Sequence, residues 1–89
     1  MPHTYRLASD VVFKEVSDGG VLLSRSSGQY RQVNTTGTRV LQRLVAGEPW
    51  TAILDHMIER YPGIDEGRLS QDLSQMLEGL ADEGVLVRV

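Results

Sequence analysis

Hydrophobic and polar positions follow two different patterns along the chain, and the first third has the pattern of short strands. Aliphatic and β-branched runs occur at Val11–Val16 (VVFKEV), Val21–Ser24 (VLLS) and Gln29–Val33 (QYRQV). Turn residues separate the runs, and Asp18-Gly19 in the first turn is typical of a β-hairpin because glycine tolerates positive φ. The pattern predicts a three-stranded antiparallel meander whose third strand lies at an edge of the sheet.

From Asn34 onward the apolar residues recur with the period of a helix. Asn34, Thr35 or Thr36 can cap a first helix that ends at Gly47. Pro49 suits the first turn of a second helix. The apolar residues of that helix fall at i, i+3, i+4, i+7, i+8 and i+11 and form one buried stripe: Trp50, Ile53, Leu54, Met57, Ile58 and Tyr61.

Pro62-Gly63 ends the second helix, and Asp65 can cap a third one. One face of this third helix carries Leu69, Leu73, Met76, Leu77 and Leu80, Gly84 ends it, and VLVRV closes the chain in extended form. The order of elements predicts an α+β domain of the winged helix-turn-helix type, with a three-stranded antiparallel β-meander followed by three α-helices. We expect residues 1–89 to form one domain, with residues 1–9 loosely ordered.

Composition excludes several classes of protein. The chain has 89 residues, of which 40% are hydrophobic and 24% charged, as in ordinary soluble domains. It has no apolar run long enough to span a membrane, and its first residues lack the layout of a signal peptide. Because cysteine is absent, disulfides and thiolate metal sites are excluded, and we expect a cytoplasmic location.

No motif of a catalytic or cofactor site is present. His56 and Glu59 stand at i and i+3 on one helix, which supplies half of a metal site, but no second His or Cys cluster completes it. The sequence also lacks the glycine-rich and nucleophile motifs that bind phosphates or perform acyl transfer. We therefore expect no enzyme activity, no cofactor and no metal.

The distribution of charge along the chain distinguishes binding of an acidic partner from binding of DNA. Residues 1–43 carry a net charge of +3 and residues 44–89 a net charge of −6, so the first half can attract an acidic partner. A DNA-binding regulator of the winged-helix type would place the third helix in the major groove. The polar residues of that helix are mostly acidic, which disfavours contact with phosphates, although Gln71 and Gln75 could read bases. A structural or dimerising module is a third alternative.

The third strand has a feature that suits peptide binding. Edge strands expose unpaired backbone groups, and proteins usually protect them with Lys, Pro or a bulge. Residues Gln29–Val33 contain no Pro, and Arg31 is their only charge. The edge is therefore open to strand addition by another chain, in which backbone pairing gives affinity and side-chain pockets give selectivity.

Two longer stretches of the chain form a distinctive combination: GQYRQVNTTGTRVLQRLVAGEP from Gly28 and ILDHMIERYPGIDEGRLSQDLSQMLEGLADEGVLV from Ile53. Together they resemble the PqqD family of recognition elements for ribosomally synthesised and post-translationally modified peptides (RiPPs). The matching features include the aromatic strand that ends at Asn34, the Tyr61-Pro62 break and the leucine pattern from Leu69 to Leu86. The length of the chain most resembles the small stand-alone leader-binding proteins of lasso-peptide pathways.

The resemblance implies that the protein performs no chemistry and binds the leader segment of a precursor peptide. The leader would add to the third strand, in a groove beside the third helix, and a leader peptidase and a cyclase would be further partners. We expect a monomer that binds neither nucleic acid nor membrane. On this hypothesis the peptide-binding residues are Gln29, Tyr30, Arg31, Gln32, Val33, Arg68, Leu69, Asp72, Leu73, Gln75 and Met76. Tyr30 and Gln32 share one face of the strand and Arg31 and Val33 the other, and the sequence leaves open which face is buried.

Overall fold

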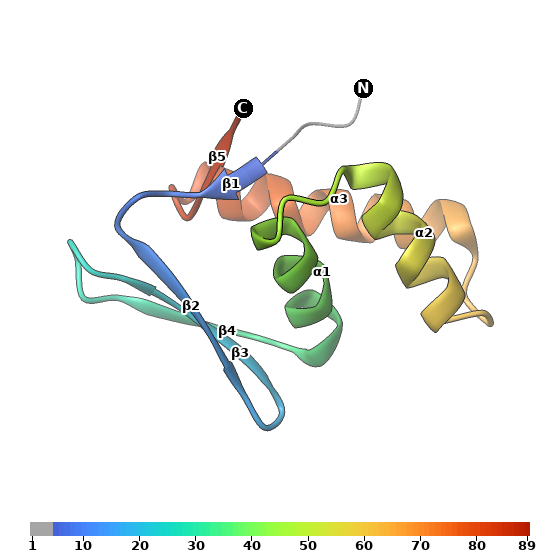
Figure 1. Cartoon of the computed structure of the whole chain (residues 1–89), viewed down its shortest axis with the longest axis horizontal. Coiled ribbons are helices and arrows are strands. Elements are labelled where there is room, and N and C mark those ends of the chain that lie inside the picture. Colours follow the sequence, from blue (N-terminus) through green and yellow to red (C-terminus); the bar gives the residue numbers. More distant parts are fainter. Residues whose placement is uncertain (1–4) are drawn as a thin grey trace.

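The computed structural model describes residues 5–89, which form two small antiparallel sheets and three helices (Figure 1). The larger sheet contains β2 (Val11–Val16), β3 (Gly19–Ser24) and β4 (Tyr30–Val33) in the order β2-β3-β4. This meander confirms the sequence prediction. The turn between β2 and β3 is shorter than expected, because Gly19 and Gly20 are already paired with Val16 and Glu15.

Gly19 is required where β3 begins. Its φ is +146°, and a Cβ at this position would lie 2.2 Å from the carbonyl oxygen of Val33. The close approach brings the end of β4 against the start of β3, and Gly20 pairs with Val33 in the register. The chain then enters the first helix directly after β4.

The three helices are α1 (Thr35–Val45), α2 (Trp50–Arg60) and α3 (Glu66–Asp82). Their caps agree with the sequence: the Asn34 side chain accepts a hydrogen bond from the Gly37 amide at 2.8 Å, and Asp65 accepts one from the Arg68 amide at 2.9 Å. Pro49 precedes α2 as its N-cap. The order of three strands followed by three helices confirms the predicted α+β class.

The N-terminal segment is more ordered than the sequence indicates. β1 (Tyr5–Leu7) pairs with β5 (Leu86–Arg88) in a second, two-stranded sheet. Tyr5 is 6% exposed, and its hydroxyl donates a hydrogen bond to Glu78 Oε1 at 2.8 Å. This burial holds residues 5–7 in a strand that the sequence did not indicate; residues 1–4 lie outside the described part of the chain.

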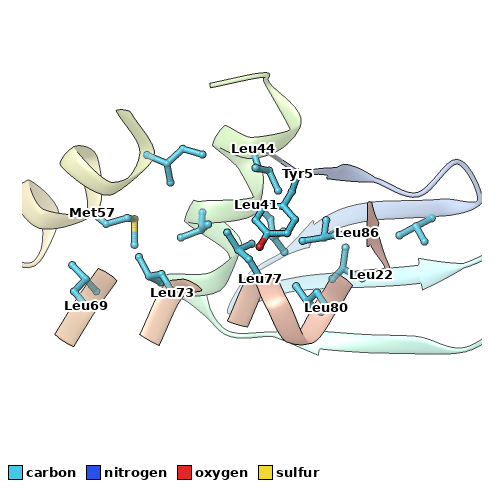
Figure 2. Packing of buried hydrophobic residues seen from close by; sticks show 13 residues of the cluster. Tyr5, Leu22, Leu41, Leu44, Met57, Leu69, Leu73, Leu77, Leu80 and Leu86 are labelled. Atoms are coloured by element: carbon cyan, nitrogen blue, oxygen red, sulfur yellow. The ribbon is translucent and has the colours of Figure 1, made fainter. Parts of the chain in front are cut away.

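The core lies between the larger sheet and the helices (Figure 2). Its most enclosed side chains come from β3, α1, α2 and α3: Leu22, Val40, Leu41, Ile53, Met57 and Leu77. Tyr5 and Leu86 join the same cluster from the smaller sheet. Val11 and Leu22 are buried while Leu23 and Tyr30 are exposed, so one face of the larger sheet meets the core and the other faces outward. Within residues 5–89, no helix has both the length and the apolarity to cross a membrane.

Candidate functional site

The outer edge of β4 is the first part of the candidate site. β4 is the last strand of its sheet, and no strand of residues 5–89 pairs with its second edge. The Ser24 amide donates to the carbonyl of Gln29 at 2.9 Å, which fixes the hydrogen-bonding pattern of the hairpin. In an antiparallel pair, hydrogen-bonded and non-hydrogen-bonded residue pairs alternate. Arg31 and Val33 therefore direct their backbone groups to β3, and Tyr30 and Gln32 direct theirs outward.

The hydrogen bonds between β3 and β2 lead independently to the same directions for the backbone groups of β4. The Arg25 amide donates to the carbonyl of Asp10 at 2.8 Å. By the same alternation, Val21 and Leu23 pair their backbone groups with β2, which leaves those of Leu22 for β4. The outward N–H and C=O groups of Tyr30 and Gln32 are thus four backbone groups available to an added strand.

The register also decides the face on which each side chain of β4 lies. Arg31 pairs with the buried Leu22, and Tyr30 pairs with the exposed Leu23. Side chains of directly paired residues lie on the same face of a sheet. Arg31 and Val33 therefore lie on the face that the helices cover, and Tyr30, which is 68% exposed, lies with Gln32 on the outer face.

α3 provides a wall opposite β4. A hydrogen bond joins the two near the start of β4, and near its end both approach Gly37 of α1. Near the start of β4, the Arg31 guanidinium donates to Glu83 Oε1 just after the end of α3. Near the end of β4, Val33 and Met76 both approach Gly37, where a Cβ would lie 2.5 Å from Val33 Cγ1 and 3.1 Å from Met76 Sδ. β4 therefore runs opposite in direction to α3, from Glu83 toward Met76.

A cavity of about 170 Å³ opens between the start of β4 and the residues that follow α3. Val11, Leu22 and Val85 supply apolar surface to it, and hydroxyl, amide and charged groups complete its lining, which comprises Ser24, Ser27, Gln29, Tyr30, Arg31, Glu83 and Gly84. The site thus combines unpaired backbone groups at one strand edge with a partly apolar hollow beside it. Such a surface can bind an extended peptide.

The turn that leads into β4 is held by Asp10. Its carboxylate accepts hydrogen bonds from the hydroxyls of Ser26 and Ser24. These hydroxyls hold the pKa of Asp10 below its usual value, with Ser26 making the larger contribution. Gly28 closes the turn at φ +73° and donates its amide to the Ser24 carbonyl at 2.9 Å. These contacts fix where β4 begins.

The predicted site residues fall into two groups. The strand residues Gln29, Tyr30, Arg31, Gln32 and Val33 lie along the open edge, and Met76 and Val33 both approach Gly37. The roles of these residues in peptide binding stay predictions.

The remaining helix residues lie elsewhere on α3. Leu69 and Leu73 are 5% and 4% exposed and pack in the core. Arg68 and Asp72 are exposed in the first half of α3 and form an i,i+4 ion pair at 3.9 Å. Gln75 is exposed next to Met76. Their contribution to a groove also stays a prediction.

Sequence reasoning missed Glu83, Gly84 and Val85. Glu83 stands seven residues after Met76, which places both on one face of a helix. That spacing was a usable signal, but an acidic residue near a helix end is most simply read as solvated. Among the described residues, no group of three or more His, Cys, Asp or Glu side chains could hold a metal ion.

Comparisons with known proteins identify the same kind of fold. The model of a family described as coenzyme PQQ synthesis protein D (PqqD) matches residues 19–86. The solved structure of TbiB1 in complex with the TbiA(beta) leader peptide is similar with a TM-score of 0.84 and 27% identity, over 92% of this chain and 94% of TbiB1. A lasso peptide synthetase B1 complexed with the leader peptide is similar with a TM-score of 0.85 and 24% identity, over 94% of this chain and 98% of the synthetase chain. A comparison with curated proteins finds no match.

Proposed function

Because the chain belongs to the PqqD family, we propose that it binds the leader segment of a ribosomally synthesised precursor peptide as an added β-strand. The leader pairs with the outer edge of β4 and lies between this strand and α3. The protein performs no chemistry on the leader. It delivers the precursor to the leader peptidase and the cyclase of a lasso-peptide pathway by raising the local concentration of their substrate.

The observation that carries this proposal is the outward direction of the backbone groups of Tyr30 and Gln32. No strand of residues 5–89 pairs with them, and neither Pro nor Lys protects the edge. The likeness to TbiB1, whose structure contains a leader peptide, supports the same occupant for this edge.

The expected affinity follows from the number of groups available. Four backbone hydrogen bonds at about 1 kcal/mol each, with two buried leader side chains at about 2 kcal/mol each, give a gross gain of about 8 kcal/mol. A net gain of that size corresponds to a Kd of about 1 μM. Ordering a flexible leader lowers the gain, and contacts with the cavity beside β4 raise it.

A titration tests the proposed function. Fluorescein-labelled leaders of the precursor peptides encoded beside this chain's gene, with the TbiA(beta) leader as a further probe, are titrated with the protein and followed by anisotropy. We expect a Kd near or below about 10 μM for at least one leader and no binding of its scrambled version. A labelled DNA duplex forms the second arm, in which we expect no binding. Failure of every leader to bind at about 100 μM protein, or preferential binding of the duplex, would contradict the proposal.

A further inference from the structure

α3 contains a glycine that its own fold does not require. Gly79 lies in the interior of this 17-residue helix, where glycine is less favourable than alanine because it loses more backbone entropy. A Cβ at Gly79 would meet no atom of residues 5–89 within 4 Å, apart from the helix's own nearby backbone. In contrast, a Cβ at Gly37 would collide with Val33, so that glycine is explained by packing.

The position of Gly79 on the helix is defined by its neighbours one turn away on either side. Met76 precedes it by three residues and Glu83 follows it by four, so all three lie on one face of α3. Met76 approaches Gly37 beside Val33, and Glu83 accepts a hydrogen bond from Arg31. Gly79 therefore lies on the face of α3 that carries Met76 and Glu83, between these two residues along the helix.

We propose that Gly79 is a specificity-determining residue of the peptide groove, because its missing side chain leaves room for one large side chain of the bound leader. This inference rests on the proposed function. Met76 and Glu83 are seven residues apart, which is about 10 Å along a helix. We call the open space over Gly79, between Met76 and Glu83, the opening. A large leader side chain placed there would be obstructed by an alanine or a leucine at position 79.

The groups on either side of the opening indicate which side chain it accepts. The Met76 thioether is adaptable and makes favourable contacts with aromatic rings. At the other end the Arg31 guanidinium is paired with Glu83, and its flat surface can stack on an aromatic ring. Glu83 disfavours an acidic side chain in the same place. The leader residue that faces Gly79 is therefore large and apolar or aromatic.

The variants Gly79→Ala and Gly79→Leu test this inference because stability and binding should change in opposite directions. Both substitutions favour the helix, so we expect the melting temperature of Gly79→Ala to rise by about 4 °C. For the leader that binds wild-type protein, we expect Kd to increase about threefold in Gly79→Ala and at least about tenfold in Gly79→Leu. The measurements are thermal unfolding and the anisotropy titration with the labelled leader.

Gln71→Leu is the matched control, since it adds the same side chain to an exposed site two turns nearer the start of α3. Its Kd should equal that of the wild type. Wild-type binding with an unchanged Kd in Gly79→Leu would overturn the inference and leave the proposed function intact. Absence of leader binding by the wild type would overturn the proposed function and the inference with it.

An alanine scan of the leader identifies the residue that occupies the opening. Replacement of one large apolar or aromatic leader residue by alanine should weaken binding of the leader to the wild-type protein at least about tenfold. The same replacement should have no adverse effect on binding to Gly79→Leu, because the two substitutions act on one contact and are not additive. Additive effects at every leader position would contradict a direct contact with Gly79.

Discussion

Tyr5 connects the first described strand to α3 through one buried hydroxyl. The phenol lies within the core cluster (Figure 2). It donates a hydrogen bond to Glu78, whose other carboxylate oxygen accepts a hydrogen bond from Arg88 at 2.7 Å. Burial, followed by the hydrogen bond to Glu78, raises the pKa of Tyr5 above its ordinary value. Glu78 and Asp82 in turn raise the pKa of Arg88. One cluster of side chains thus holds both strands of the smaller sheet on α3.

The raised pKa of Tyr5 predicts a loss of stability at alkaline pH. The folded state favours the neutral phenol, so this contribution is complete below the ordinary pKa of 10.0 and declines as the pH rises through the folded pKa. Tyr5→Phe should be less stable than the wild type by about 1 kcal/mol at pH 8, and the difference should shrink above pH 10. Urea unfolding of both proteins at several pH values measures it.

Tyr61→Phe provides a contrast in the same experiment. The hydrogen bond from Thr36 lowers the pKa of Tyr61, so the folded state favours its ionised form. The contribution of Tyr61 should therefore be greatest above the ordinary pKa of 10.0 and be lost as the pH falls through the folded pKa. Stability differences from the wild type that change with pH in the same direction for Tyr5→Phe and Tyr61→Phe would contradict the assignment of these two hydrogen bonds.

At the scale of the element, β4 has two edges with different roles. The edge formed by Arg31 and Val33 completes the sheet with β3, and the edge formed by Tyr30 and Gln32 is directed outward. Because of this alternation, mutations at neighbouring residues of β4 should affect folding and binding separately. A single strand can therefore contribute to folding and to binding through different backbone groups.

Proline substitutions separate the two edges. Gln32→Pro removes an outward N–H, so we expect the protein to remain folded and leader binding to weaken at least tenfold, or about 1.4 kcal/mol. Arg31→Pro removes an N–H that pairs with β3, so we expect a loss of about 1–3 kcal/mol in the free energy of unfolding. Circular dichroism during urea unfolding and the anisotropy titration measure the two effects.

Gln32→Ala is the control, because it removes the side chain and retains the N–H. We expect its affinity for the leader to stay within about twofold of the wild-type value. An equal loss of binding in Gln32→Ala and Gln32→Pro would show that the side chain, and not the backbone edge, binds the leader. Unfolding of Gln32→Pro with retention of fold in Arg31→Pro would show that the assigned directions are reversed.

The sequence predicts the elements whose signals are local. Asn34 and Asp65 cap their helices as their residue types indicate, because a cap depends on only three or four neighbouring residues. β1 and β5 could not be predicted as a pair, because each has only three residues and the paired residues Tyr5 and Arg88 stand at opposite ends of the sequence. The strands of the meander, in contrast, are joined by short turns.

In the candidate site, too, some features can be predicted from the sequence and others cannot. The open edge of Gln29–Val33 is predictable from the absence of Pro and Lys. The directions of Tyr30 and Arg31 are not, because a shift of one residue in register exchanges them and the register depends on hydrogen bonds such as that from Ser24 to Gln29. Glu83 becomes part of the candidate site only when the fold brings Arg31 beside it.

On the scale of the whole molecule, α1 packs against the larger sheet and α2 lies beyond α1, away from that sheet (Figure 1). β4 is an outer strand of the sheet. The chain can thus bury its core on one face and still offer an unpaired edge to a partner. Residues 1–43 carry a net charge of +3, so the half of the chain that contains β4 can attract acidic leader residues.

Amide hydrogen exchange tests strand addition at β4 most directly. In the free protein the Tyr30 and Gln32 amides should exchange rapidly, and the Arg31 and Val33 amides should already be protected by β3. With saturating leader, NMR should show exchange at least about tenfold slower at Tyr30 and Gln32, with little change at Arg31 and Val33. Unchanged exchange at Tyr30 and Gln32 in the saturated complex would contradict binding of the leader at this edge.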